Sequence, residues 1–270
     1  MTQHAHIATL ALANEHGQDQ PIEQLLQQAQ QLQQQGVVEL HLHSSNGCAY
    51  GANNAANQTT PPLFQLCQQL TQLGMWLRLP LCQPSANLDE LMPLMATGQV
   101  LPYFELDYVH PSPELLPEGH PAIEINTLDQ LDYWREQCPD LVVRGHVLIG
   151  NDTPAQFELL QDWLLAAQLD QLEIHTCGDA TVASLRQQQL LEQQEPISAS
   201  KHYNRVEDEM LILIDSIGED GAIGRYFGQA YGNGQVTIAG EYDINPGDLV
   251  WVGIEFADHL NLYGVLLEEE

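Results

Sequence analysis

Residues 211–257 read LILIDSIGEDGAIGRYFGQAYGNGQVTIAGEYDINPGDLVWVGIEFA, and this stretch decides the fold of the last part of the chain. It contains four short apolar runs: LILIDSI, GAIGRYF, QVTIAGEY and LVWVGIEFA. The segments GED, GNG and NPGD lie between these runs, and they consist mostly of the residues that tight turns favour. Short strands joined by such turns predict a small all-β antiparallel barrel.

The preceding two thirds of the chain alternate short apolar runs with amphipathic helical stretches. The apolar runs predict strands at residues 4–10, 37–43, 75–81, 103–109, 141–149 and 171–176. Helices are predicted at residues 21–35 and 62–73, and a third begins at Thr153 and Pro154, with Asp152 or Thr153 suited to cap it. Strands that alternate with helices are typical of a parallel sheet, so six such units indicate an α/β domain built as a partial (β/α)6 barrel.

The pattern changes near Glu195 and Pro196, which indicates a boundary between two domains. A proline followed by the segment ISAS favours a linker rather than a regular element. We therefore expect residues 1–195 to form the α/β domain, and residues 196–270 to form the linker and the barrel.

The chain is strongly acidic. Lysine and arginine together number 7, aspartate and glutamate number 37, and the formal net charge is −30. Nucleic-acid backbones and anionic membrane surfaces attract cationic proteins, so neither a nucleic acid nor a membrane is an expected partner. A basic protein is the expected partner, because opposite charges steer association.

The first residues, MTQHAHIATLALANEHG, have no cationic start and only a short apolar run, which indicates no targeting or membrane segment. The 5 cysteines are scattered along the chain, a pattern typical of reduced thiols. Together these features predict a cytoplasmic protein.

Two segments of the predicted barrel, EDGAIGR at residues 219–225 and GEYDINPGDLVWV at residues 240–252, resemble the TRAM domain of a known family. Four upstream segments follow that family's order: CAYG at 48–51, LGMWLRL at 73–79, LMPLMATGQVLPY at 91–103 and YWREQCPDLVVR at 133–144. The family is that of the radical S-adenosylmethionine methylthiotransferases, particularly the RimO group, which modifies an aspartate of a ribosomal protein. The resemblance implies a radical-SAM-type partial barrel followed by a TRAM domain.

The resemblance also implies an iron–sulfur enzyme, but the residues that would hold the cluster are missing. In the family a CxxxCxxC loop follows the first barrel strand, because the cluster needs three thiolates. Here residues 10–21, LALANEHGQDQP, run from the first strand to the first helix without a cysteine, and the family's amino-terminal second-cluster domain has no counterpart. We therefore interpret the chain as a truncated, non-catalytic relative with no cofactor and no catalytic, cofactor-binding or metal-binding residues.

Closely spaced histidines and a cysteine on the predicted strands leave a metal site open as an alternative. The pairs are His4 and His6, His41 and His43, and His175 and Cys177. Residues two apart on a strand share one face, so these side chains can gather in the barrel lumen. Imidazoles together with a thiol could bind zinc or another transition metal there, built chiefly on His41, His43, His175 and Cys177.

The other interpretation is a lumen filled by side chains. Polar and aromatic groups would then occupy the space left by the lost cofactor and form hydrogen bonds with one another. In this interpretation Arg144 is the counter-charge of a lumen carboxylate such as Glu105 or Asp107.

The predicted barrel is itself strongly acidic. From Arg205 to Glu270 there are two basic and fourteen acidic residues, a formal charge of −12. Such a surface repels RNA and attracts a basic protein. We place the partner-binding residues in the turn and strand that contain Glu219, Asp220, Arg225 and Tyr226, with the last two as a hydrogen-bonding and aromatic anchor.

Three functional hypotheses follow from the sequence. The first is a RimO-like pseudoenzyme that binds a basic ribosomal or translation-related protein. The second is a metal protein or an enzyme with a new histidine and cysteine site in the lumen. The third is a module that binds S-adenosylmethionine or a related nucleoside without cluster chemistry.

Overall fold

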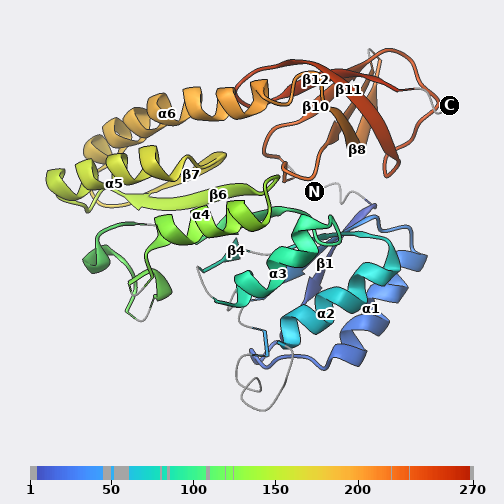
Figure 1. Ribbon diagram of the computed structural model, residues 1–270, viewed down its shortest axis with the longest axis horizontal. Helices are drawn as coiled ribbons and strands as arrows, with labels where there is room; N and C mark the ends of the chain where they lie inside the picture. The colour runs from blue at the N-terminus through green and yellow to red at the C-terminus, as the bar shows by residue number, and fades with distance from the viewer. Residues whose placement is uncertain are drawn as a thin grey trace. The chain divides into compact units, whose positions relative to one another are not determined.

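The computed structural model describes residues 5–44, 50–51, 61–79, 81–83, 86–107, 110–118, 120–123, 125–219, 221–230 and 232–267 (Figure 1). The chain divides into two compact units. One comprises Ile7–Gln193, and the other comprises Met1–His6 together with Gln194–Glu270.

The described residues of the larger unit form seven parallel strands in two sheets. Their bounds are β1 Ile7–Ala11, β2 Glu39–His43, β3 Trp76–Arg78, β4 Leu81–Cys82, β5 Tyr103–Leu106, β6 Val142–Ile149 and β7 Gln171–Thr176. The order is β1-β2-β3 in one sheet and β4-β5-β6-β7 in the other, so neighbours in space are neighbours in sequence. The single strand expected at residues 75–81 is thus divided: β3 pairs with β2, and β4 pairs with β5.

Helices connect these strands, which confirms the expected alternation. The bounds are α1 Ile22–Gln34, α2 Pro62–Leu70, α3 Ala86–Ala96, α4 Thr127–Gln137, α5 Pro154–Ala167 and α6 Ala180–Tyr203, with short 3-10 turns at Thr71–Leu73, Pro113–Leu115 and Pro121–Ile123. Thr153 caps α5 as predicted, because its side chain accepts the Gln156 N–H while the Gln156 side chain accepts the Thr153 N–H.

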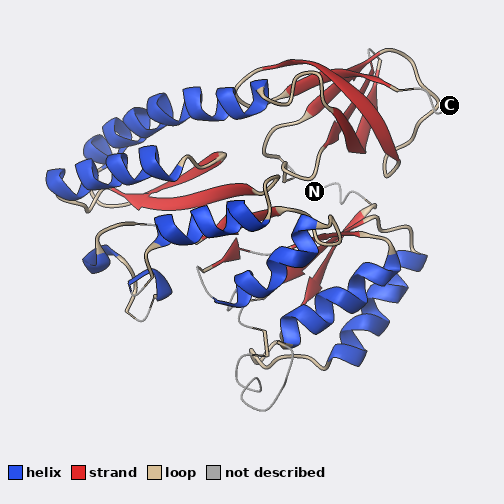
Figure 2. Ribbon diagram, in the orientation of Figure 1, coloured by secondary structure: helices blue, strands red, loops and turns tan. Residues whose placement is uncertain are grey.

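The core of this unit lies between the strands and the helices. Alternate strand residues pack into this core, including Leu40, Leu77, Phe104 and Val143, which are buried. Helix residues such as Trp134 complete the same core. The Trp134 ring packs edge to face against the Phe104 ring, with 5.0 Å between the ring centroids. Figure 2 shows the blue helices α1, α2 and α3 along one side of the red strands. One strand face is therefore used for apolar packing, and the other is left for polar groups.

The smaller unit contains a closed five-stranded barrel. Its strands are β8 Glu209–Gly218, β9 Gly221–Arg225, β10 Val236–Ala239, β11 Leu249–Ala257 and β12 Leu262–Leu266, in the order β10-β12-β11-β8-β9. A small barrel after the α/β region was predicted, but β12 was missed. A fully antiparallel arrangement was also wrong, because β10 and β12 pair in parallel where they meet.

The linker expected after Glu195 and Pro196 is instead helical, because α6 runs without a break from Ala180 to Tyr203 and contains Pro196. In the described part of the chain, no helix combines the length and apolar character that crossing a membrane requires.

Candidate functional site

The strand face opposite the helices carries an unusual number of ionisable side chains. They come from two strands of the first sheet and three of the second: Glu39 and His41 on β2, Arg78 on β3, Tyr103 and Glu105 on β5, Arg144 and His146 on β6, and Glu173 and His175 on β7. Residues two apart on a strand point the same way, so parallel pairing in this register aligns them on one face within each sheet. We call this set the strand-face network.

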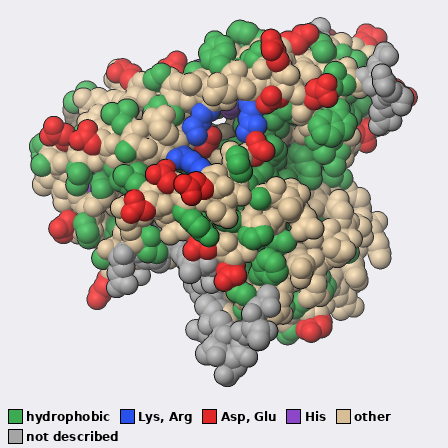
Figure 3. All heavy atoms as spheres, viewed as in Figure 1, with side chains coloured by type: hydrophobic (Ala, Val, Ile, Leu, Met, Phe, Trp, Pro, Cys, Tyr) green, Lys and Arg blue, Asp and Glu red, His purple; other side chains and the backbone are tan. Residues whose placement is uncertain are grey.

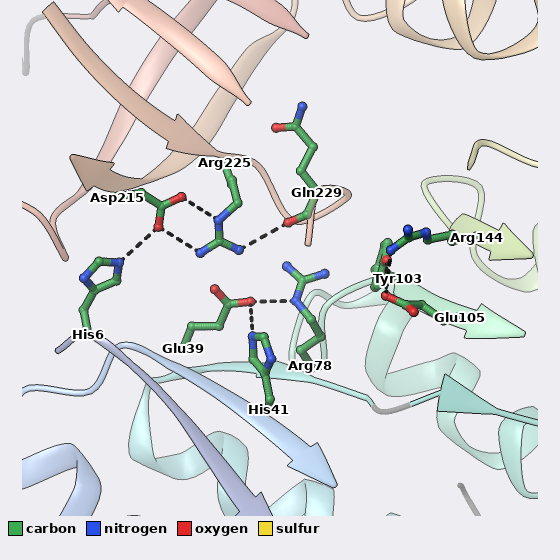
Figure 4. A network of polar contacts seen from close by, with 10 residues as sticks. All are labelled: His6, Glu39, His41, Arg78, Tyr103, Glu105, Arg144, Asp215, Arg225 and Gln229. Carbon is green, nitrogen blue, oxygen red and sulfur yellow. Dashed lines mark hydrogen bonds and ion pairs between the residues drawn. The ribbon is translucent and has the colours of Figure 1, made fainter. Parts of the chain in front are cut away.

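Its first half is centred on Glu39, whose side chain is fully buried. The Arg78 Nε donates to Glu39 Oε1 at 2.6 Å, and the His41 Nε2 lies 2.9 Å from the same oxygen (Figure 4). The Arg78 guanidinium also stacks over the Tyr103 ring, 4.6 Å from its centroid. Because Tyr103 belongs to the second sheet, this contact joins the two halves of the network.

The second half is centred on Glu105. The Tyr103 hydroxyl donates to Glu105 Oε1 at 2.7 Å, and Arg144 Nη1 lies 3.6 Å from that oxygen. On the other carboxylate oxygen, His146 Nε2 lies at 2.8 Å, and His146 Nδ1 is 3.1 Å from His175 Nε2. Of the two carboxylates that the sequence offered to Arg144, Glu105 is the one it lies near, and Arg144 also contacts Glu173, which was not considered.

The electrostatics of this half favour a permanent ion pair. Burial alone raises the pKa of Glu105, but hydrogen bonds with His146 and Tyr103 and the charge of Arg144 lower it to about 2. Burial and the neighbouring Glu105 raise the pKa of Tyr103 well above its ordinary range. Glu105 therefore stays ionised and Tyr103 stays neutral at any physiological pH, so this part of the network is suited to structure rather than to proton transfer.

Beyond β5, three more ionisable groups are partly or fully buried. Burial raises the pKa of Asp107 and lowers the pKa of His110 and of His120. The ring Nδ1 of each histidine accepts a backbone N–H, from Ser112 at 2.9 Å and from Ala122 at 3.2 Å. These histidines are thus held neutral by local turns.

The residues present do not fit an iron–sulfur cluster. The segment between β1 and α1 is a closed turn without a cysteine: Asn14 Oδ1 accepts the N–H groups of His16 and Gln18, and Gln20 N donates to the Leu12 carbonyl. A cluster needs three converging thiolates, and this connection offers none.

The described cysteines do not replace that donor set. Cys67 and Cys138 are buried, and burial raises their thiol pKa to about 12 and about 11. Cys177 directs its thiol to the Ile149 carbonyl at 3.4 Å. Cys82 is disulfide-bonded, so the expectation of reduced thiols throughout is wrong for this residue.

The residues of the alternative metal site do not converge. His41 contacts Glu39 on β2, whereas His175 contacts His146 on β7, and His43 is exposed at the end of β2. Over the described residues, no group of three or more histidine, cysteine, aspartate or glutamate side chains could hold a metal ion. His4 lies outside the described residues.

A second polar network lies in the smaller unit. Arg225 forms two hydrogen bonds with Asp215, Nε to Oδ2 at 2.6 Å and Nη2 to Oδ1 at 3.0 Å, and its Nη1 donates to the Gln229 carbonyl at 3.3 Å (Figure 4). His6 Nε2 lies 3.1 Å from Asp215 Oδ1. Asp215 and Arg225 also line a cavity of about 380 Å³ whose wall includes Ser216, Gln235 and Asn261.

The residues proposed from the sequence for partner binding fall in different environments. Arg225 and Tyr226 are only 1% and 3% exposed, so they do not offer an anchor to a partner at the surface. Glu219 is exposed in the turn between β8 and β9, and Asp220 lies outside the described residues. Sequence reasoning missed His146 and Arg78, although each occupies a strand position that faces the network.

Replacing Glu105 by glutamine is expected to destabilise the protein by about 1–3 kcal/mol at pH 7, because His146 and Arg144 lose a charged partner. The folded-state pKa of Glu105 is about 2 and its ordinary value is 4.5, so its contribution is complete above pH 4.5 and is lost as the pH falls toward 2. Urea unfolding at pH 7 and pH 3 should therefore show a smaller difference between wild type and variant at the lower pH. Glu158→Gln, an exposed change on α5, is the control; an effect of equal size at both pH values would contradict this account.

Comparison with known proteins gives clear relatives, although no family model matches the chain. A ribosomal protein uS12 methylthiotransferase RimO of Pseudomonas fluorescens is 34% identical over 275 residues, covering 92% of this chain and 61% of the relative. The enzyme of the same name from Vibrio cholerae is 34% identical over 274 residues, covering 92% and 58%. The chain thus spans about three fifths of the length of the curated relatives it matches.

Among solved structures, SuiB of Streptococcus suis aligns with a TM-score of 0.47 at 11% identity, covering 70% of this chain and 46% of that one. A likeness this weak supports no conclusion about the chain. The sequence relatives do, because their identity extends over nearly all of it. The chain is a homologue of the RimO family of ribosomal protein uS12 methylthiotransferases.

Proposed function

We propose that this chain is a non-catalytic RimO-like protein that binds a basic ribosomal protein. In this proposal the seven parallel strands form a degenerate partial barrel of the radical SAM type, and the closed barrel is a TRAM domain. In this proposal residues 1–195 form the first domain and residues 196–270 the second. The division of the compact units between Gln193 and Gln194 supports that boundary, whereas Met1–His6 belong to the smaller unit.

The observation that carries the proposal is the closed turn between β1 and α1. The family resemblance places three cluster thiolates there, whereas this chain has a cysteine-free turn fastened by Asn14. The turn also has contacts of its own: Tyr50 donates to the Gln20 carbonyl at 2.7 Å, and Gly51 N donates to Asp19 at 2.8 Å. A segment that satisfies its own hydrogen bonds in this way does not need a bound group to order it.

The strand-face network supports the same conclusion. Glu39 and Tyr103 are fully buried and Arg78 is 3% exposed, and their polar groups are matched to one another rather than directed toward an open cavity. Buried ion pairs are stable only when both charges are well partnered, as they are here. We infer that side chains occupy the face on which the family resemblance would place a cofactor.

Ribosomal protein uS12 is the candidate partner, because the names of the relatives identify it as the protein they modify. A ribosomal protein that packs against RNA must carry cationic side chains, and this chain carries −30 in all. On the face drawn in Figure 3, red acidic side chains are spread widely and blue basic ones are few. Binding in the cytoplasm, without nucleic acid as the ligand, is part of the proposal.

Anaerobic reconstitution with iron and sulfide is expected to leave iron far below the amount needed for a four-iron cluster, since no three thiolates converge in the described residues. Cys177→Ser is the matched control, because it removes the partly exposed thiol that could bind iron adventitiously. A brown protein with charge-transfer absorption and stoichiometric iron would overturn the proposal.

The same sample separates the proposal from the two other hypotheses. Zinc near one equivalent, lost in a His41→Ala, His175→Ala variant, would favour the metal site. Tight binding of S-adenosylmethionine in a calorimeter would favour the nucleoside module. Neither is expected, because the residues concerned are already engaged with other protein groups.

A further inference from the structure

Strand β11 exposes large apolar side chains on its outer face. Val252 and Ile254 point into the barrel and are buried, whereas Leu249 and Trp251, on the opposite face, are 37% and 52% exposed. Outward positions of a solvated strand are normally polar, because alternation places apolar residues inside. An exposed tryptophan on a strand of this barrel therefore calls for a functional explanation.

The neighbouring strands extend this apolar surface on both sides of Trp251. Leu211 on β8 is its direct cross-strand partner, and on the other side Leu267 N donates to the Trp251 carbonyl at 2.9 Å. Val265 on β12 lies opposite Gly253, which adds no side chain of its own. We call the set Leu211, Leu249, Trp251, Val265 and Leu267 the Trp251 stripe; all five are exposed or partly exposed.

Acidic groups border the stripe. Glu209 is the cross-strand partner of Gly253, and Glu255 follows on β11; both are exposed. The arginines of this part of the chain do not balance them, because Arg225 is buried against Asp215 and Arg205 lies 3.9 Å from Asp208. On the face drawn in Figure 3, green hydrophobic and red acidic side chains lie next to one another over the barrel, at the upper right. An apolar centre with an anionic rim is complementary to a segment that has an apolar anchor and cationic neighbours.

We propose that the Trp251 stripe is the docking surface for a cationic protein segment that inserts an aliphatic or aromatic side chain between its lysines or arginines. The inference rests on the proposed function and deepens it, because it assigns the contact with the partner to the exposed Trp251 rather than to the buried Arg225 and Tyr226. Exposed apolar patches mark interaction sites, and tryptophan is one of the residue types enriched among the few residues that dominate binding. Tryptophan also stacks on nucleic-acid bases, but the acidic rim repels phosphates and so favours protein.

The test uses the full chain and purified ribosomal protein uS12 as the probe, with the dissociation constant measured at low salt. Trp251→Ser is expected to weaken binding at least about tenfold. Trp251→Phe is expected to retain most of the wild-type affinity, since phenylalanine keeps an aromatic anchor. Leu185→Ser is the matched control, because Leu185 is 59% exposed on α6 outside the stripe. Unfolding midpoints of all three variants should match the wild type within experimental spread, because none of these side chains is buried.

Three results would overturn the inference, and they differ in whether the proposed function is overturned as well. If uS12 binds the wild type and Trp251→Ser binds equally well, the stripe is not the docking surface, but the proposed function stands. If uS12 does not bind the wild type at all, the proposed function fails with it. If a single-stranded RNA binds through Trp251 while uS12 does not, the partner class is wrong.

Discussion

Arg225→Met is expected to destabilise the smaller unit by about 3–5 kcal/mol, more than Glu105→Gln destabilises the larger one. Arg225 is 1% exposed and Asp215 is 7% exposed, and the guanidinium supplies two of the hydrogen bonds that the carboxylate accepts. Removing the cation leaves a buried carboxylate with His6 as its remaining described ionic partner. Urea unfolding followed by the fluorescence of the tryptophans measures the change.

Two further variants identify the cause of that loss. Arg225→Met combined with Asp215→Asn should recover much of the stability, because the asparagine is neutral and still accepts a hydrogen bond from His6. Arg205→Met removes a half-buried arginine whose acidic neighbour Asp208 is exposed, so Asp208 stays solvated and the cost should be less than about 1 kcal/mol. If the double variant is as unstable as Arg225→Met alone, the packing of the arginine stem, rather than its charge, holds this unit together.

The elements of the fold were predictable where local pattern and packing agree. The strand at β7 was found with its bounds intact, and β2, β6 and α1 within two residues, because apolar periodicity and turn residues mark them. The linker at Pro196 was wrong for an identifiable reason. Leu190, Gln194, Ser198 and His202, each four residues apart, are all buried along one face of α6. That burial offsets the cost of proline in a helix, which sequence propensity alone sets at about 3 kcal/mol.

Residues of the site could be predicted only where the alternation of side chains along each strand was used to decide which residues share a face. Glu105 was one of the two carboxylates proposed for Arg144. His146 lies two residues after Arg144 on β6 and so faces the same way, but it was overlooked. Arg225 could not be recognised as buried from the sequence, because its partner Asp215 lies on another strand and pairing registers are not visible in local pattern. The division of residues 75–81 into β3 and β4, which belong to different sheets, is likewise decided by tertiary pairing.

Association with uS12 is expected to weaken severalfold or more between about 50 and 300 mM salt, as the Debye length shortens from roughly 14 to 6 Å. The reason is the formal charge of −12 from Arg205 to Glu270, which is not offset by exposed arginines in the described barrel. Steering of this kind acts mainly on the association rate, so stopped-flow mixing at several salt concentrations is the measurement. The dissociation rate should change less, because the Trp251 stripe is apolar.

Charge reversal tells where the steering field originates. Glu219→Lys, in the turn after β8, combined with Asp220→Lys, the next residue in sequence, should slow association and make the association rate less dependent on salt. Glu158→Lys with Asp162→Lys makes the same change of net charge on exposed positions of α5 and should do less. If both double variants slow association equally, the total charge of the chain attracts the partner, and the charges of the barrel contribute no more than those elsewhere. If the rate is indifferent to salt and to both reversals, or if the protein captures RNA in preference to uS12, electrostatic attraction to a basic protein is not what this acidic surface provides.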